Sequence, residues 1–470
     1  SVTAVSNTVN RYEKFELDVG LTNVAGLNPY EPNDVNLQAR FVSPSGRVWN
    51  LWGFYLEDPG VANSGRWKVR FAPGETGTWS YVVSVTNMYM TNASVSATQT
   101  FQCVAGSRHG WVRVSDNDAH YLEHHDDTPF IGKGYCRCWD GDDEGVFIEA
   151  EEHGINMIHW WMAAWDTMLT VDRADPSETW REKSTYYSYE QGRAAELDRI
   201  IGHAEKHGVK FVFTIWPHDS IRDFNYHKWR INGSWQKAFD HKFSEPEWYI
   251  NAFSQLDDPP KNQRFFTDAK YKKYQENLYR YIIARWGYSE AIGMWALASE
   301  MFGTFANSLN CINYQDPLWV TNKNAMFGEN PLYNMDPSQS DGKDHTIEWL
   351  AYIHGFFKTN DPFGHPTTAS YATDEYWEHG FPVVDITQIH TYADLYSWIT
   401  PPVSVSKYHH YLNAHYNKPS FMGEIGTVDW KKYEPDYTRV TAWPGLCAGA
   451  AVTPMMWTTP PFSWFGDAKM

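Results

Sequence analysis

Two glutamates stand at the ends of short apolar runs, where a carboxylate could take part in chemistry. The first run is GMWALASE, which ends at Glu300, and the second is PSFMGE, which ends at Glu424. Continuous apolar runs of this length predict strands buried on both faces, as in parallel sheets. A charge at the end of such a strand costs free energy unless it faces a polar cleft. Glu300 and Glu424 are therefore candidate catalytic residues.

A pair of carboxylates is what hydrolysis of a glycosidic bond requires. In the retaining form of that reaction one carboxylate attacks the sugar and the other cycles between acid and base. The chain between Glu300 and Glu424 has room for about three strand–helix units of a (β/α)8 barrel, whose strand ends carry the active site. Either glutamate alone would be an ordinary loop residue about as often as a catalytic one, so the prediction depends on the pair. This chemistry needs no metal and no cofactor.

The composition of the chain also favours a carbohydrate substrate. The chain has 470 residues, with 39 basic and 57 acidic side chains and a net charge of −18. That balance argues against a nucleic acid or an anionic membrane surface as the main partner. Aromatic residues make up 17% of the chain, including 24 Trp. Flat aromatic faces stack well on sugar rings, so a carbohydrate substrate is favoured over an aromatic core alone.

The sequence carries weaker signals about compartment and redox state. No apolar stretch reaches the ~18 residues of a membrane-spanning helix. The chain begins with a polar segment at Ser1, which fits a bacterial secreted or periplasmic protein whose signal peptide has been removed. Its five cysteines form neither a disulfide framework nor a zinc pattern. Cys136 and Cys138 lie two apart on a predicted strand, so they share a face, but this spacing suits a disulfide poorly. Nothing in the sequence fixes the oligomeric state.

Residues 1–105 predict an all-β domain. Short stretches that alternate apolar and polar residues are separated by Pro- and Gly-rich turns. The expected strands include residues 15–19, 35–41, 67–71 and 79–83. Strands at this spacing favour a β-sandwich of immunoglobulin-like size. Residues 106–129 then predict a bridging hairpin.

Residues 130–470 show strands alternating with amphipathic helices, which predicts a (β/α)8 barrel. The remaining predicted strands are residues 130–135, 155–161, 209–215, 367–371, 383–390 and 450–457, and the predicted helices are residues 146–153, 191–207, 270–286 and 346–359. The longest loops follow strands 2, 3 and 4, all at the catalytic rim. The usual closing helix after strand 8 is missing from the pattern. The expected fold class is thus an all-β sandwich followed by a TIM barrel.

Other strand ends carry residues that suit the same site. Strand 3 ends in Trp216 and His218, strand 6 in His390 and Tyr392, and strand 8 in Trp457. With the two glutamates, this ordered set resembles clan A glycoside hydrolases, in particular family 5. The preceding sandwich is similar to a domain found in candidate bacterial glycoside hydrolases. The resemblance covers residues 130–457 in the barrel.

The resemblance implies a role for each matching residue. Glu300 would be the acid/base and Glu424 the nucleophile, with Tyr392 bonded to the nucleophile. His390 would lie beside the acid/base, and Trp457 would be the platform under the reacting sugar. One position departs from the pattern, because the clan usually has Asn before the acid/base and this chain has Ser299. That Asn contacts the sugar 2-hydroxyl, so another group would have to reach it, or the substrate would differ there.

Further polar and aromatic residues leave alternatives open. His159 and Trp160 follow strand 2 and are candidate substrate contacts, as are the nearby Trp161 and Trp165. Arg137 could reach the pocket or pair with the acidic loop of Asp140, Asp142, Asp143 and Glu144. That loop could contact a sugar, but its spacing fits no common calcium loop. A histidine group at His120, His124 and His125 precedes strand 1 at the bottom of the barrel, where a solvated loop is favoured over a metal site.

The sequence therefore predicts a retaining glycoside hydrolase acting on a β-linked poly- or oligosaccharide. Two alternatives use the same fold. One is a non-catalytic carbohydrate-binding protein, which the serine at position 299 motivates. The other is a transglycosylase with the same catalytic residues, which sequence cannot separate from a hydrolase.

Overall fold

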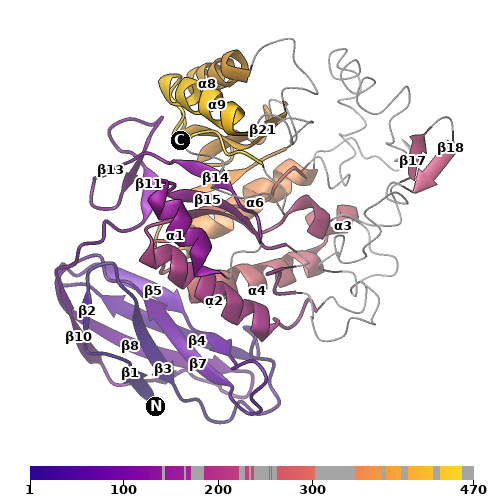
Figure 1. The fold of residues 1–470 in the computed structure, drawn as a ribbon. Coiled ribbons are helices and arrows are strands. Elements are labelled where there is room, and N and C mark those ends of the chain that lie inside the picture. Colours follow the sequence, from indigo (N-terminus) through magenta and orange to yellow (C-terminus); the bar gives the residue numbers. More distant parts are fainter. Residues whose placement is uncertain are drawn as a thin grey trace.

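The structure is a computed structural model. It describes residues 1–139, 143–163, 166–170, 185–221, 228–231, 234–237, 253, 256, 262–301, 345–371, 377–392, 401–426 and 434–457. Two parts are distinct in Figure 1: a pair of β-sheets at the N-terminal end, and a parallel sheet surrounded by helices.

The N-terminal part consists of two facing sheets. One has the order β1-β3-β7-β6, and the other has the order β2-β10-β8-β4-β5 with β9 paired to β8. The strands are β1 (Val2–Ala4), β2 (Thr8–Asn10), β3 (Phe15–Val19), β4 (Val35–Val42), β5 (Val48–Trp52), β6 (Phe54–Leu56), β7 (Arg66–Phe71), β8 (Gly77–Asn87), β9 (Ser94–Val95) and β10 (Gln99–Val104). All four strands expected from alternation are present, with bounds within four residues of the expected ones.

Alternation explains why these strands form a sandwich. In β4, residues Leu37, Ala39 and Phe41 are buried while Gln38 and Arg40 are exposed, so one face of the sheet turns inward. Buried aromatic side chains from both sheets meet in one core, in which Phe15 of β3 stacks on Phe101 of β10 at 3.8 Å between ring centroids. The burial of these rings from both sides holds the two sheets together.

A small three-stranded sheet connects the sandwich to the barrel. It consists of β11 (Val112–Val114), β12 (Leu122–His124) and β13 (Pro129–Phe130), paired antiparallel in that order. Val112, Leu122 and Phe130 pack with residues from the barrel interior. The bridge therefore forms the apolar floor of the barrel, more than the simple hairpin that the sequence predicts.

The C-terminal part is a seven-stranded parallel sheet in a nearly closed barrel. Its order is β14-β15-β16-β19-β20-β21-β22, so successive strands are neighbours. The strands are β14 (Gly134–Cys136), β15 (Met157–Trp161), β16 (Lys210–Thr214), β19 (Ile292–Ala296), β20 (Thr367–Ala369), β21 (Ile386–Tyr392) and β22 (Ser420–Gly426). Each lies where the sequence predicts a barrel strand, although strand 1 begins at Gly134 instead of residue 130. A separate hairpin pairs β17 (Lys228–Ile231) with β18 (Ser234–Lys237).

The predicted eighth strand, residues 450–457, is an irregular segment with isolated bridges. It bonds to both edges of the sheet: Gly132 N donates to Ala451 O at 3.1 Å, and Ile425 N donates to Met455 O at 2.8 Å. Pro454 in its middle has no N–H to donate, which interrupts a regular ladder. The segment still spans the gap between β22 and β14, so the barrel closes without a full eighth strand.

Helices pack around the outside of this sheet. They are α1 (Glu144–Glu152), α2 (Gln191–Lys206), α3 (Asn262–Thr267), α4 (Ala269–Trp286), α6 (His345–Asn360), α8 (Pro401–Tyr416) and α9 (Glu434–Cys447), with a short 3-10 turn η1 (His218–Ser220). Capping carboxylates start several of them, as Asp143 does for α1 and Asp268 for α4. The long insertions predicted after strands 2, 3 and 4 lie mostly outside the described residues.

The strands divide their side chains between two cores. Ile158, Trp160 and Phe213 point outward and pack with the helices. Met157, Trp161 and Val212 point inward to the barrel interior. This period of two is the expected pattern for strands covered on both faces. It decides which strand residues can reach an active site inside the barrel.

The sandwich lies against α2 and α4 (Figure 1). An ionic group with buried arginines joins them. Asp198 of α2 accepts bonds from Arg70 of β7 at 2.7 Å, from Arg285 of α4 at 2.7 Å and from the Trp286 indole at 2.7 Å. Burial alone would raise the pKa of Asp198, but the two guanidinium groups outweigh it and hold that pKa below its usual range. One carboxylate thus ties the sandwich to two barrel helices.

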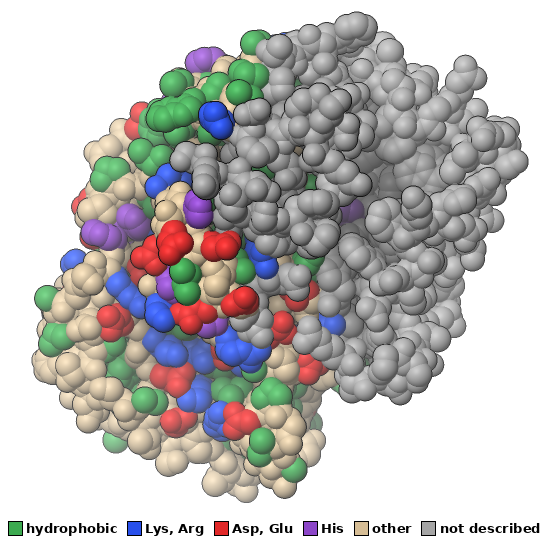
Figure 2. Space-filling view, viewed as in Figure 1, with side chains coloured by type: hydrophobic (Ala, Val, Ile, Leu, Met, Phe, Trp, Pro, Cys, Tyr) green, Lys and Arg blue, Asp and Glu red, His purple; other side chains and the backbone are tan. Residues whose placement is uncertain are grey.

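The outer surface shows mixed charge. Figure 2 shows acidic and basic side chains intermingled on the face where α1 and α2 adjoin the sandwich. One ion pair between these helices joins Lys206 and Glu144 at 2.5 Å. Among the described residues, no helix is both long enough and apolar enough to cross a membrane.

We predict that Asp198→Asn lowers the free energy of unfolding by about 3 kcal/mol at pH 7. This is the low end for breaking a buried ion pair, because a quarter of the Asp198 side chain is exposed. Chemical denaturation measures the change. The matched control is Asp58→Asn, whose partner Arg66 forms an exposed pair with it, and which should change stability little.

The same variant has a pH signature. Since the folded-state pKa of Asp198 is depressed, its contribution is present above the unfolded pKa of about 3.9 and is lost as pH falls through the folded pKa. The stability gap between wild type and Asp198→Asn should stay constant from about pH 7 to pH 5 and shrink below about pH 4. A gap that does not depend on pH would contradict the assignment.

Candidate active site

Glu300 and Glu424 lie on either side of one buried histidine. His390 Nδ1 is 2.9 Å from Glu300 Oε1 and 3.3 Å from Glu424 Oε1. One oxygen of each carboxylate and a ring nitrogen of His390 all lie within 4.8 Å of one another. Glu424 is 3% exposed and His390 is fully buried, whereas the Glu300 side chain is 22% exposed. The group therefore has a sealed side at Glu424 and an accessible side at Glu300.

A β-bulge turns Glu424 into the barrel. Along β22, Phe421 packs in the barrel interior and Met422 packs outward against the helices, so strict alternation would aim residue 424 outward. The register between β21 and β22 instead skips one residue, pairing Ile389 with Met422 and then His390 with Glu424. The extra residue is Gly423. Because one residue of slip exchanges the two faces of a strand, Glu424 faces inward beside His390.

The strand that precedes Glu300 also contains a β-bulge at a glycine. β16 and β19 pair Phe211 with Ile292 and then Val212 with Met294, which leaves Gly293 as an extra residue. Ile292 packs outward and Met294 inward. Met294 and Ala296 both pack in the barrel interior, and β19 ends at Ala296, four residues before Glu300. A glycine bulge thus precedes each of the two glutamates.

Glycine is required at 423 because another side chain fills its space. A Cβ added there would lie 1.9 Å from Gln388 Nε2 and within 3 Å of two further atoms of the same side chain. Gln388 therefore lies flat against the bulge. Its amide nitrogen is 3.1 Å from His390 Nε2, and its carbonyl oxygen is 3.4 Å from Thr368 Oγ1.

These contacts fix the proton on the histidine. The Gln388 amide donates to His390 Nε2, so that nitrogen accepts and Nδ1 carries the hydrogen. His390 then donates its Nδ1–H toward Glu300 Oε1, with Glu424 Oε1 close by. A single histidine can in this way serve both carboxylates.

The backbone at Glu300 is held in an unusual conformation. Its φ is +53°, a left-handed value that side chains other than glycine and asparagine adopt at a cost. Two bonds from the end of the next strand hold it: Glu300 N donates to Ser370 Oγ at 2.9 Å, and Met301 N donates to Ser370 O at 3.0 Å. The preceding Ser299 bonds through its backbone N to Trp216 O at 3.0 Å. Its hydroxyl is buried and has no hydrogen-bond partner among the described residues.

An aromatic wall stands next to the carboxylates. The indoles of Trp139, Trp161 and Trp457 contact one another, with ring centroids 5.2 to 6.0 Å apart. Trp161 also meets the ring of His218 edge-on at 6.3 Å, and His218 Nδ1 is 3.7 Å from Glu300 Oε2. Trp139 and Trp457 are only partly buried. The wall thus offers ring surface at the mouth of the site.

Below Glu424 lies a second polar group. His159 Nδ1 is 3.1 Å from Gly423 O, and the thiol of Cys136 donates to the same oxygen at 3.0 Å. His159 Nε2 is 2.8 Å from Thr214 Oγ1. Burial, and then the neighbouring His390, lowers the pKa of His159 to about 3, so this imidazole is neutral. Cys136, Cys138 and His159 bring three possible metal ligands within 4.8 Å of one another.

Several predicted site residues lie elsewhere. Trp160 packs outward on Phe211, and the Trp216 indole donates to Tyr279 in the helix layer. Both indoles are buried in that outer core, so the structure does not bring them to the carboxylates. Arg137 is buried at the end of β14. The side chain of Tyr392 lies outside the described residues, as do Trp165, Asp140 and Asp142.

The bottom histidines and Asp143 of the acidic loop have ordinary partners. His124 bonds to the carbonyl of Gly110, and His120 bonds to Asp118. Asp143 caps α1. Among the described residues, none of these belongs to a cluster of metal-ligand type.

Three residues at the site escaped the sequence analysis. Trp139 follows strand 1 as the predicted residues follow their strands. The expectation that residues at the end of a barrel strand face the active site, called here the strand-end rule, could therefore have found it. Ser370 and Gln388 carry no signal in sequence, because their importance depends on which strands are neighbours and on the bulge at Gly423.

The fold is shared with a solved structure. A candidate glycoside hydrolase from Bacteroides vulgatus matches 98% of this chain and 74% of its own, with a TM-score of 0.62 and 15% identity. The endo-1,4-β-D-mannanase of Thermotoga petrophila matches 70% of this chain and 88% of its own (TM-score 0.45, 13% identity). The β-mannanase of the blue mussel Mytilus edulis matches 77% and 95% (TM-score 0.46, 13% identity). At 15% identity the first match establishes a common fold.

Sequence comparison adds one family. Residues 8–86, in the sandwich, match a domain of unknown function, DUF5060. No curated protein matches the sequence.

We predict that Gly423→Ala destabilises the protein by about 1–3 kcal/mol, the usual cost of an added group in a packed interior. The new Cβ must push the Gln388 amide away from His390. Thermal and chemical unfolding measure the loss. Gly355→Ala in α6 is the control, because a Cβ there meets nothing within 4 Å, and alanine should stabilise the helix by about 0.5–1 kcal/mol.

Adding Gln388→Ala to Gly423→Ala tests the cause. If the clash is with Gln388, the double variant should recover part of the lost stability, a coupling that independent sites would not show. Strictly additive losses would contradict the proposed contact.

Proposed function

We propose that this protein is a retaining glycoside hydrolase that cleaves a β-linked poly- or oligosaccharide. The observation that carries the proposal is the group of Glu300, His390 and Glu424, in which an oxygen of each carboxylate lies within 4.8 Å of the other. Retaining enzymes place the two carboxyl groups about 5–5.5 Å apart, whereas inverting enzymes need about 6.5–9.5 Å to admit a water. The shared barrel fold supports the same proposal.

In the first step, Glu424 attacks the anomeric carbon and forms a glycosyl ester as the bond to the leaving oxygen breaks. Glu424 suits this role because it is the sealed carboxylate, 3% exposed and aimed by the bulge. Glu300 gives its proton to the leaving oxygen at the same time. Its accessible position suits a group that must meet both the departing sugar and water.

In the second step, Glu300 takes a proton from a water molecule, and that water attacks the anomeric carbon and releases Glu424. The Nδ1–H of His390 points between the two carboxylates. It can stabilise the negative charge on Glu300 after the first proton transfer and on Glu424 once the ester has broken. His218 is the second imidazole beside Glu300.

The surroundings suit a sugar ring. Trp457, with Trp161 and Trp139 beside it, presents an aromatic face of the kind that stacks on pyranose rings. The buried hydroxyl of Ser299, which has no partner among the described residues, is available to a substrate hydroxyl. Serine is shorter than the expected asparagine, so the sugar would approach this strand end more closely.

The remaining features are consistent with a secreted or periplasmic bacterial polysaccharide hydrolase. We propose that residues 1–105 form an immunoglobulin-like domain with a scaffolding role, that residues 106–129 bridge it to the barrel, and that residues 130–470 form the catalytic domain. The ionic group at Asp198 makes the sandwich a rigid support for α2 and α4.

The alternative is a carbohydrate-binding protein without catalysis. The replacement of the expected asparagine by Ser299 is the observation in its favour. The presence of both carboxylates around one buried histidine favours the hydrolase.

Release of reducing sugar from a panel of plant, algal and microbial β-glycans tests the proposal. We expect wild type to cleave one class of glycan and Glu424→Gln to lose that activity, because the amide cannot form the glycosyl ester. Equal activity in both proteins would refute the role of Glu424. Binding without cleavage in both would establish the alternative.

Leaving-group dependence separates the two carboxylates. Glu300→Gln should slow hydrolysis of natural glycans by about 10²–10⁴-fold, the usual contribution of general acid–base catalysis. Aryl glycosides with acidic leaving groups need no proton in the first step, so the variant should retain much of that step, seen as a burst of released phenol. Glu424→Gln should show no burst. The opposite pattern would exchange the two roles.

A further inference from the structure

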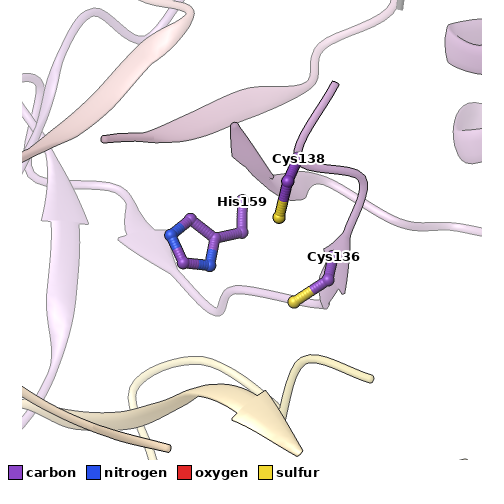
Figure 3. A group of neighbouring side chains, drawn as sticks. All are labelled: Cys136, Cys138 and His159. Carbon is purple, nitrogen blue, oxygen red and sulfur yellow. The ribbon is translucent and has the colours of Figure 1, made fainter. Parts of the chain in front are cut away.

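We propose that Cys136, Cys138 and His159 form a binding site for a thiophilic d10 cation such as Zn²⁺ or Cu⁺ in the barrel interior, below Glu424. Figure 3 shows the two sulfur atoms and the imidazole ring facing a common space. Their ligand atoms all lie within 4.8 Å of one another. Two thiols and an imidazole are the donor set that such cations prefer.

The backbone preorganises this group. Cys136 and His159 are register partners on the neighbouring parallel strands β14 and β15. Cys138 follows two residues after Cys136, so it returns to the same face, and both cysteines pack in the barrel interior. All three side chains are at least 96% buried. Two of the three donors lie on rigid strands, so the group needs only a small further approach to reach the bond lengths of about 2.0–2.3 Å in zinc sites.

Figure 3 shows the Nδ1 edge of the imidazole toward the sulfur atoms. If Nδ1 binds a cation, the proton moves to Nε2, and Thr214 Oγ1 at 2.8 Å can accept it. The Trp161 indole N–H, which donates to Nε2 at 3.2 Å, must then turn away. Ligating histidines usually give their other N–H to such a partner. His159 is neutral, as a ligand must be.

The Cys136 thiol donates a hydrogen bond to Gly423 O before a cation arrives. Burial, and then the bond from Cys136, raises the pKa of Cys138. Binding would therefore release the thiol protons to solvent as the metal–sulfur bonds form, with no change in oxidation state. Three protein ligands complete a trigonal Cu⁺ site, or leave one position of a tetrahedral Zn²⁺ site for water.

A bound cation would act on the neighbouring carboxylate. Cys136 and His159 are both bonded to the carbonyl of Gly423, the residue before Glu424. Drawing the Cys136 sulfur and His159 Nδ1 onto a cation removes both of these bonds at the bulge that aims Glu424. This consequence, slower hydrolysis in the loaded protein, rests on the proposed function. Binding of the cation does not rest on the proposed function.

Titration with Cd²⁺ tests the site directly, followed by the thiolate-to-metal absorption band under reducing conditions. We expect one equivalent to bind wild type. The variant Cys136→Ser/Cys138→Ser should lose the band, and serine at 136 can still donate to Gly423 O. The matched control replaces Cys103, Cys311 and Cys447 by Ser, which leaves the cluster intact and should retain the band.

Three results would overturn the proposal: no band in wild type, a band that survives in Cys136→Ser/Cys138→Ser, or a band lost in the control. Should the variants fold poorly, X-ray absorption of wild type loaded with Zn²⁺ or Cu⁺ gives an independent answer. Two sulfur ligands and one nitrogen ligand are expected, and any set without two sulfurs contradicts the site. Since none of these readouts is enzymatic, failure of the hydrolase proposal would leave this result interpretable.

Discussion

The candidate site depends on two single-residue interruptions of β-sheet register. Parallel strands covered on both faces alternate between the barrel interior and the helix layer, and a residue can change faces only if the alternation breaks. Gly423 makes that break in β22 and Gly293 makes it in β19. In β22 this turns Glu424, which strict alternation would bury among the helices, toward His390. The position of the bulge in the backbone therefore decides which residue of β22 faces the site.

The interior around these bulges is polar, and several of its polar groups have defined partners. Gln388 fills the space over Gly423 and fixes the tautomer of His390. His159 and Cys136 satisfy the carbonyl of Gly423 from below. Unsatisfied buried donors and acceptors would each be costly, so such a network holds its members in one arrangement. The buried hydroxyl of Ser299 is an exception among the described residues, and it stands beside Glu300, where a substrate would arrive.

The architecture was largely predictable from sequence because strands buried on both faces leave a strong signal. Seven barrel strands lie where apolar runs predict them, and alternation located the sandwich strands. The prediction of an eighth strand was only partly right, since Pro454 interrupts the hydrogen bonding of that segment. The three-stranded floor was expected only as a hairpin.

The site was less predictable, for two physical reasons. Residues after a strand were all treated as facing the pocket, but neighbours in sequence face opposite ways, which is why Trp160 and Trp216 belong to the outer core. Groups that act through contacts between strands, such as Gln388 on Gly423 and Ser370 on Glu300, depend on register that a single sequence does not encode visibly. The glutamates, His390 and Trp457 needed only the strand-end rule, and the structure places them around one space or at its mouth.

Covalent trapping tests the central claim most directly. Wild type would be incubated with a set of activated 2-deoxy-2-fluoro-β-glycosides, which slow the second step of double displacement more than the first, and then analysed by intact-protein mass spectrometry and peptide mapping. The account predicts a gain of one fluoroglycosyl group on the peptide that contains Glu424, and no gain in Glu424→Gln. An adduct on another residue, or turnover of the same glycosides with no adduct and with inversion at the anomeric carbon, would contradict it.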